Sequence, residues 1–259
     1  MTTPTRTCPI LSWPGGKSRM LKQIIPAITP HVCFCEPFAG GLAVLFAKER
    51  SKVEIVNDVN GDLVALYRNL QYHLPALLGE LDWLFSSRQN LMEFKQQPGL
   101  TELQRAARFL LMNRTSFAGN MRSFGVVKTA RDSVAFDHKA IAPLLARAND
   151  RLDGVVVEHL PYERCLKNYD SPDTFFFMDP PYLNADTGAY DGWSEAKMRE
   201  FSGRVRSLQG NWITTVDDSE FNRKLFSGCA IKPVSAQNRL CNVRTHSSVR
   251  FGELIITPK

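Results

Sequence analysis

Thr174-Phe175-Phe176-Phe177-Met178-Asp179-Pro180-Pro181-Tyr182 is the stretch that decides the fold of this 259-residue chain. Its first five residues form an apolar, β-prone run that predicts a buried strand. The strand must end at Asp179, because the two prolines that follow lack an N–H and have a fixed φ. A carboxylate, a rigid elbow and an aromatic ring are therefore left at the carboxyl end of a strand, where open α/β sheets bind ligands.

The side chains of this elbow have the chemistry to hold an amino group that projects from a nucleobase. Such an amine is a poor nucleophile, because its lone pair is delocalised into the ring. Asp179 and the carbonyl of Pro180 can each accept one N–H and favour a tetrahedral nitrogen, while Tyr182 can stack on the base. A base reaches such a pocket only by leaving the duplex, and stacking returns part of that cost. The motif alone fits an ordinary strand-ending turn capped by Asp179 equally well.

The composition is that of an ordinary globular protein, with 44% hydrophobic and 22% charged residues. A net charge of +6 and an isoelectric point near 9.1 fit a polyanionic partner, although basic proteins without one exist. No apolar run approaches the ~20 residues of a membrane helix, and Met1–Arg6 does not look like a secretory signal. The six cysteines lack metal-binding spacing, so we expect reduced thiols, no metal and a cytoplasmic protein.

Residues 8–30 predict a short strand at Cys8–Leu11, a turn at Trp13–Lys17 and a helix that ends near Pro26. Gly16-Lys17-Ser18 resembles part of a phosphate loop, but Leu11 stands where that loop needs its first glycine. Lys17 is instead expected to reach the carboxylate or adenine end of a small ligand. A solvated helix lysine is the alternative.

Residues 31–58 predict a nucleotide-type βα unit. A strand at Val32–Cys35 leads into the glycine turn Glu36–Gly41, where backbone can approach a ligand and Glu36 can fix an ammonium. A second strand closes at Asp58, at the spacing that brings a carboxylate to ribose hydroxyls. The alternative for Asp58 is the cap of the helix that begins near Asn60.

In residues 71–154 strands and helices no longer alternate, and three helices are expected near 74–84, 102–113 and 137–151. Between the last two lies a loop or β-hairpin, 114–131, in which basic residues alternate with polar and apolar ones. Basic groups suit phosphates, Arg and Asn also read base edges, and an apolar wedge can fill the gap of a flipped base. A surface loop with scattered charges is the alternative.

In residues 155–259 predicted strands and helices alternate again. We expect strands at Val155–Val157, Trp212–Val216 and Leu254–Ile256 and a helix at Glu195–Leu208. The polar loop Ala185–Trp193 is long enough to close over a site. The basic stretch Arg239–Arg250 either touches phosphates or is a solvated loop.

Taken in order, these stretches resemble the Dam-type DNA adenine-N6 methyltransferases over nearly the whole chain. The resemblance implies an α/β fold with a seven-stranded, mostly parallel, Rossmann-like sheet. It implies S-adenosylmethionine as cofactor and double-stranded DNA as partner. It also implies a catalytic domain of residues 1–70 and 155–259, with a mainly helical target-recognition insertion at 71–154. No metal or membrane partner is expected, and we expect a monomer.

The resemblance, together with the chemistry above, gives each candidate residue a role. The expected catalytic residues are Asp179, Pro180, Pro181 and Tyr182. The expected cofactor-binding residues are Trp13, Lys17, Glu36, Phe38, Gly40, Asp58 and Asp179, with Phe38 and Gly40 under the methionine part and Asp58 on the ribose. The expected DNA-binding residues are Arg114, Thr115, Ser116, Phe117, Asn120, Met121, Arg122, Lys128 and Arg131, and Asn113 looks like part of the same segment.

The chain departs from the family pattern in three places, one of which is the segment after Arg122, which looks shorter than in Dam itself. Leu42 stands where many members have a glycine, and Ala118-Gly119-Asn120 follows Phe117 where many have Asn-Gly. These changes concern the recognised sequence, for which GATC is the family default. Three alternatives stay open: N4-cytosine methylation, a catalytically inactive DNA-binding decoy or regulator, and an RNA substrate. Asp179 favours adenine, because members that methylate cytosine more often have Ser at that position.

Overall fold

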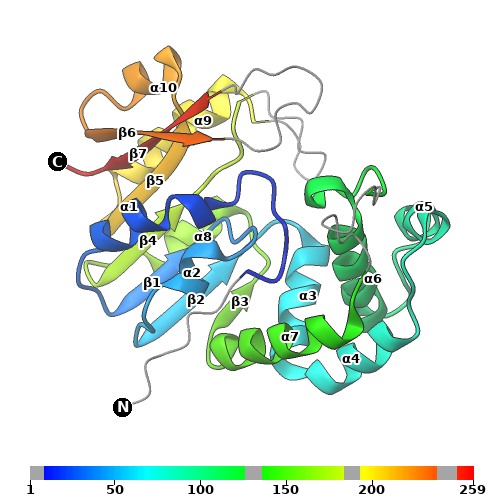
Figure 1. Cartoon of the computed structure of the whole chain (residues 1–259). Helices are drawn as coiled ribbons and strands as arrows, with labels where there is room; N and C mark the ends of the chain where they lie inside the picture. Colours follow the sequence, from blue (N-terminus) through cyan, green and yellow to red (C-terminus); the bar gives the residue numbers. More distant parts are fainter. Residues whose placement is uncertain (1–8, 126–135, 184–192, 238–249) are drawn as a thin grey trace. The chain divides into compact units, whose positions relative to one another are not determined.

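The computed structural model of the chain describes residues 9–125, 136–183, 193–237 and 250–259. Its strands are β1 (Cys33–Glu36), β2 (Val53–Asn57), β3 (Val156–Glu158), β4 (Thr174–Met178), β5 (Asn211–Asp217), β6 (Ala230–Gln237) and β7 (Arg250–Thr257). They form a seven-stranded sheet in the order β3-β2-β1-β4-β5-β7-β6 (Figure 1). β1 runs parallel to β2 and β4, and β4 parallel to β5, whereas β7 is antiparallel to β5 and β6. The predicted α/β fold with a seven-stranded, mostly parallel sheet is confirmed.

β4 is the strand that the opening stretch predicts, and it lies at the centre of the sheet. Every side chain from Thr174 to Met178 is buried. The register pairs Phe176 with Cys35 of β1 on one side and with Trp212 of β5 on the other. The strand ends at Met178, as the two prolines predict, so Asp179 is the first residue beyond its carboxyl end.

The chain divides into two compact units. The sheet unit comprises residues 17–39, 48–57 and 160–259, and the helical unit comprises residues 1–16, 40–47 and 58–159. The helical unit contains the expected insertion 71–154 and further residues on both sides of it, so the expected functional boundaries stay a prediction.

The α-helices are α1 (Leu21–Ile24), α2 (Ala43–Ala47), α3 (Gly61–Tyr72), α4 (Leu74–Asp82), α5 (Arg88–Gln96), α6 (Glu102–Thr115), α7 (His138–Leu152), α8 (Tyr162–Tyr169), α9 (Glu195–Arg206) and α10 (Glu220–Leu225), and the 3-10 turns are η1 (Lys17–Arg19), η2 (Ile25–Ala27) and η3 (Phe117–Gly119).

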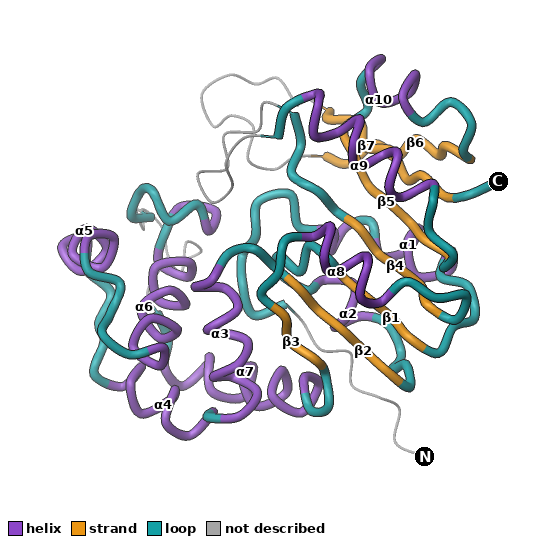
Figure 2. The backbone as a smooth tube through the Cα atoms, turned by 180° about the vertical axis from the view of Figure 1, so that it is seen from behind, coloured by secondary structure: helices purple, strands orange, loops and turns teal. Residues whose placement is uncertain are grey.

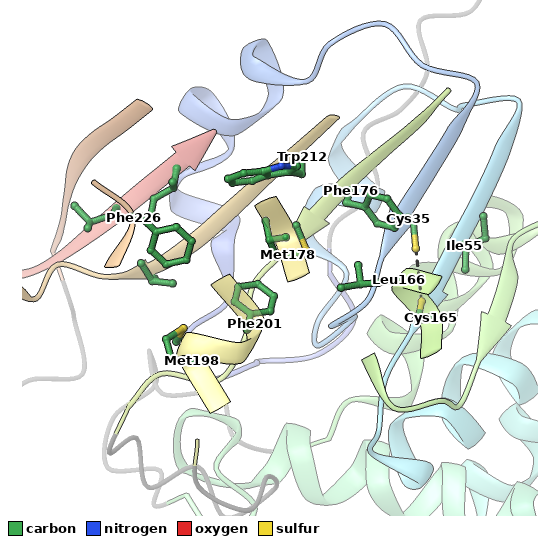
Figure 3. Close-up of a cluster of buried hydrophobic side chains, with 14 residues drawn as sticks. Cys35, Ile55, Cys165, Leu166, Phe176, Met178, Met198, Phe201, Trp212 and Phe226 are labelled. Carbon is green, nitrogen blue, oxygen red and sulfur yellow. Dashed lines mark hydrogen bonds between the residues drawn. The ribbon is translucent and has the colours of Figure 1, made fainter. Parts of the chain in front are cut away.

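Helices cover both faces of the sheet unit. Figures 1 and 2 show α8 and α9 on one face and α1 on the other. On the α8–α9 side, Phe201 and Met178 belong to one buried cluster, which Figure 3 shows in close-up. The Sγ atoms of Cys35 and Cys165 lie 3.7 Å apart in the same cluster as free thiols. This packing holds β4 in place from one side and so fixes the residues that follow it.

The helical unit is a small bundle in which α3 packs on α6 and α7, and α4 packs on the same two helices (Figure 2). Side chains of the preferred capping types begin α3, α6 and α7. Asn60 accepts the N–H groups of residues 62 and 63 at the start of α3, and Thr101 and Asp137 cap α6 and α7 in the same way. The predicted helix near Asn60 is therefore confirmed, with Asn60 itself as its cap.

The structure differs from the sequence-based expectation at several short elements. The strand expected at Cys8–Leu11 is wrong for the described residues 9–11, because Pro9 lacks a donor and the backbone of Ser12 pairs with a side chain of α6. Helices α5, α8 and α10 and strand β6 were not expected. The loop residues 184–192 and the basic stretch 239–249 lie outside the described residues. Within the described ranges, no helix is long and apolar enough to cross a membrane.

Candidate functional site

Lys17 and Asp179 form an ion pair at the carboxyl end of β4. Lys17 begins η1 with only 3% of its side chain exposed, and its Nζ lies 2.8 Å from Oδ2 of Asp179. The same Nζ lies 3.5 Å from Oε2 of Glu253 on β7. Asp179 keeps 21% of its side chain exposed, so its carboxylate is not buried in the hydrophobic core. The sequence assigned Lys17 and Asp179 to one site, and the structure brings them into contact.

The second oxygen of Asp179 is also held. Oδ1 accepts a hydrogen bond of 2.7 Å from the hydroxyl of Thr215, which is fully buried on β5. Because β4 and β5 are neighbouring parallel strands, their carboxyl ends lie side by side. Two donors from different elements therefore fix the direction of one carboxylate, which is how a precise acceptor is built.

Tyr182 joins this group through its hydroxyl and its ring. The hydroxyl donates to Oε2 of Glu253 at 3.0 Å, and Nζ of Lys17 lies over the ring, 5.0 Å from its centroid. Burial raises the pKa of the Tyr182 phenol well above its ordinary value, and the nearby charges of Asp179 and Glu253 raise it further. The phenol therefore stays neutral and remains a hydrogen-bond donor.

The glycine turn before α2 is fixed in the helical unit by Asp58. Oδ2 of Asp58 accepts the N–H of Gly40 at 3.0 Å, and Oδ1 accepts the N–H of Asn60 at 2.9 Å. The hydroxyl of Tyr67 donates to the carbonyl of Gly40. Gly40 has φ +45°, and a Cβ there would lie 3.0 Å from the indole of Trp13. The turn thus needs glycine for both its conformation and the close approach of Trp13.

Leu42 is one of the departures from the family pattern, and it has an unusual backbone conformation. Its φ is +54°, in the left-handed region that costs an L-residue roughly 1–2 kcal/mol. A glycine at this position, as in many members, avoids that cost. The side chain of Leu42 is completely buried in this chain, so its burial offsets the backbone strain.

The two other expected cofactor residues lie in the sheet unit. Glu36 ends β1 and is 1% exposed. Phe38 packs in an aromatic cluster, with ring centroids 5.2 Å from Tyr162, 5.7 Å from Trp193 and 5.9 Å from Phe201. Burial raises the pKa of the Tyr162 phenol, so this ring of the cluster stays neutral.

The expected DNA-reading segment begins at the end of α6. Its Arg114, Phe117 and Arg122 are exposed. Thr115 and Ser116 are buried, and their hydroxyls donate to carbonyls of α6. In the described part of this segment, up to residue 125, an antiparallel bridge joins Ser116 to Phe124.

The turn inside this segment is stabilised by its own side chains. Oδ1 of Asn120 accepts the backbone N–H groups of Arg122 and Ser123. Met121 adopts φ +52° and is half-buried. Lys128 and Arg131, the last two expected contacts, lie outside the described residues.

Asn113 holds this segment to the backbone of Ser12 near the N-terminus. Its Nδ2 donates to the carbonyls of Ser12 at 2.8 Å and Gly119 at 3.2 Å, and its Oδ1 accepts the N–H of Ser12 at 3.0 Å. With 1% exposure, Asn113 supports the segment from inside the helical unit.

Sequence reasoning missed Thr215, Glu253 and this role of Asn113. Thr215 carried a detectable signal, because it precedes the carboxyl end of an expected strand next to β4. Glu253 lies on an antiparallel strand, whose register with β5 is not readable from the sequence. No described group of His, Cys, Asp and Glu side chains could hold a metal ion.

The chain is similar in sequence to proteins of known activity. A family model described as D12 class N6 adenine-specific DNA methyltransferase matches residues 13–240. Type II methyltransferase M.CviBI of Paramecium bursaria Chlorella virus NC1A is 25% identical over 234 residues, which cover 85% of this chain and 86% of the relative. Type II methyltransferase M.MjaIII of Methanocaldococcus jannaschii is 27% identical over 271 residues, covering 90% and 92%. A DNA adenine methylase of Haemophilus influenzae is 26% identical over 278 residues, covering 95% and 92%.

Proposed function

Because the chain belongs to the D12 class N6 adenine-specific DNA methyltransferases, and is an enzyme that methylates adenine in DNA, we propose that it uses S-adenosylmethionine and acts on an adenine that has left the duplex. The observation that supports this most is the carboxylate of Asp179, which Lys17 holds on one oxygen and Thr215 on the other. It lies at the carboxyl end of β4, and open α/β sheets bind ligands at the carboxyl ends of their strands.

The residues of this chain fit S-adenosylmethionine as the methyl donor. When bound, it supplies an electrophilic methyl group on a positively charged sulfonium. Asp179 and Glu253 both lie within 3.5 Å of the one ammonium of Lys17, so these three groups sum to a negative charge that suits a cation. Glu36 is proposed for the donor's ammonium, and Phe38 for an apolar contact with its methionine part.

In the helical unit, Asp58 is proposed to hold the ribose hydroxyls. Each of its oxygens accepts one backbone N–H, which fixes the direction of the carboxylate. Gly40 allows the indole of Trp13 to lie against the turn, and Trp13 is proposed to offer an aromatic surface to the donor. These three residues form a rigid set, since Tyr67 also holds the turn.

Asp179 is proposed to act by position and not as a strong base. Its carboxylate accepts one N–H of the adenine amine, and the carbonyl of Pro180 accepts the other, which frees the lone pair of the nitrogen. That lone pair would bond in line to the methyl group that the donor supplies, while the bond between the methyl carbon and sulfur breaks. The surplus proton then leaves to water. Tyr182 is proposed to stack on the adenine through its ring, which has Nζ of Lys17 over it. Pro181 keeps the elbow rigid.

The exposed residues of the segment after α6 are proposed to bind double-stranded DNA. Arg114 and Arg122 suit phosphates or base edges, and exposed Phe117 suits an apolar contact beside a displaced base. Lys128 and Arg131 extend the same basic character along the chain. Thr115, Ser116, Asn120 and Met121 are proposed to shape the segment. GATC is the first candidate for the recognised sequence.

Expression in a host without adenine methylation tests this function. DNA from those cells, sequenced with a readout for modified bases, should carry N6-methyladenine in one short sequence. Cells that express the Asp179→Ala variant at the same level should carry none. N4-methylcytosine, or unmodified DNA in the presence of folded protein, would refute the proposal.

A further inference from the structure

Glu253 contacts two residues of the site, and we propose that it is a positioning residue that fixes the ring of Tyr182 for stacking on the target adenine. This inference rests on the proposed function, since it concerns the same site. Oε2 of Glu253 accepts the hydroxyl of Tyr182 at 3.0 Å and lies 3.5 Å from Nζ of Lys17. The first contact is the shorter, and Lys17 has a closer carboxylate in Asp179. Tyr182 is therefore the main partner of Glu253.

The ring of Tyr182 needs such a support. Tyr182 belongs to no helix or strand and follows two prolines. The prolines fix the backbone before it, but the χ angles of its side chain remain free to rotate. A hydrogen bond at the hydroxyl fixes the far end of the ring. It therefore fixes the orientation of the ring plane on which a base would stack.

Glu253 can provide this support because it stands on rigid structure. β7 is an interior strand, paired with β5 on one side and β6 on the other. The register places Glu253 opposite Asp217, the last residue of β5. The hydrogen bond therefore connects an elbow at the end of β4 to the body of the sheet. Since the pKa of Tyr182 is raised, the phenol keeps the proton that this bond requires.

Three variants separate the possible roles of Glu253. Glu253→Ala removes the acceptor, Glu253→Gln keeps an acceptor without the charge, and Tyr182→Phe keeps the ring without the hydroxyl. Glu253→Ala should lower kcat about ten- to hundredfold, the usual worth of a hydrogen bond to a charged group, with little change in KM for DNA. Glu253→Gln should retain most of kcat. Glu195→Ala is the control, because Glu195 is an exposed carboxylate on α9 that pairs with Arg199 of the same helix.

A double-mutant cycle shows whether Glu253 acts through Tyr182. In the Tyr182→Phe background, Glu253→Ala should cost less than about threefold in kcat, because the bond is already lost. A DNA duplex with 2-aminopurine at the target position gives a second readout, since stacking quenches its fluorescence. Glu253→Ala and Tyr182→Phe should both reduce that quenching.

The opposite results would overturn the inference. Equal losses from Glu253→Ala in both backgrounds would show that Glu253 does not act through the hydroxyl. A fall in melting temperature that accounts for the whole loss of activity would make Glu253 a stability residue only. If the wild-type protein does not methylate adenine, the proposed function fails; if it does and Glu253→Ala equals it, only the role of Glu253 fails.

Discussion

The hydrogen bond from Thr215 to Asp179 gives a sharp prediction. Thr215→Val replaces the hydroxyl with a methyl of similar shape and removes the donor to Oδ1 of Asp179. Valine is also β-branched and suits a strand, so β5 should persist. Asp179 is partly exposed, and water can satisfy the oxygen that loses its partner. The substitution should therefore change the direction of the carboxylate and leave the fold intact.

The magnitude follows from the charge on the acceptor. A hydrogen bond to a charged group contributes about 1.5–3 kcal/mol, about twice the worth of a neutral one. If that free energy serves to orient Asp179 in the transition state, kcat should fall about ten- to hundredfold. KM for DNA should hardly change, because Thr215 is fully buried and is not a proposed DNA contact.

The neighbouring residue provides a matched control. Thr214 is also fully buried on β5, and among the described residues its hydroxyl has no hydrogen-bond partner. Successive residues of a strand point to opposite faces, so Thr214 does not face Asp179. Thr214→Val should leave kcat unchanged and raise stability by up to about 1–3 kcal/mol, because it removes an unsatisfied buried group.

Tritiated-methyl transfer into DNA measures kcat and KM for both variants, and thermal unfolding measures their stability. Equal activity of Thr215→Val and Thr214→Val would refute the reasoning that Thr215 orients Asp179. So would a loss in Thr215→Val that appears only in KM.

Further predictions follow from the same structure. Asp179→Ala should abolish methyl transfer but retain most DNA affinity in a binding assay, since basic residues supply that affinity. Arg122→Ala should relax sequence choice by about 1–3 kcal/mol when binding is compared across sequences; equal losses on all of them would indicate a phosphate contact. Leu42→Gly should relieve the left-handed backbone but lose a buried side chain, a net loss of about 1–4 kcal/mol in chemical denaturation. The pKa of Tyr182 is raised in the folded state, so the neutral phenol contributes to the free energy of unfolding at pH values below about 10. This contribution is lost as the pH rises towards the raised pKa. Tyr182→Phe should therefore make the free energy of unfolding less dependent on pH in the alkaline range.

The sequence predicted well those features that depend on neighbouring residues. The buried run Thr174–Met178 and the two prolines after it predict β4 and its end without any knowledge of the rest of the chain. The helix expected to begin near Asn60 is α3, although its cap is Asn60 and not Asp58, which the sequence analysis offered as the alternative. The order of motifs placed Lys17 and Asp179 in one site, but it did not predict their ion pair, which joins residues far apart in the sequence.

The features that the sequence did not reveal depend on register between distant segments. Glu253 reaches Tyr182 only because β7 runs antiparallel to β5 with one particular alignment. Asn113 looked like part of a DNA-reading motif, yet its amide pairs with the backbone of Ser12, about a hundred residues earlier. Local composition cannot distinguish a polar side chain that faces a ligand from one that pairs with buried backbone.

Gly119 has a consequence for anyone who wishes to exchange specificities between relatives. A Cβ at this position would lie 1.9 Å from the carbonyl oxygen of Ser12, and its φ is +71°. A graft of residues 114–131 from another chain would therefore clash unless it brought a glycine in the same conformation. Chimeras should be designed with Ser12, Asn113 and Gly119 transferred as one cassette.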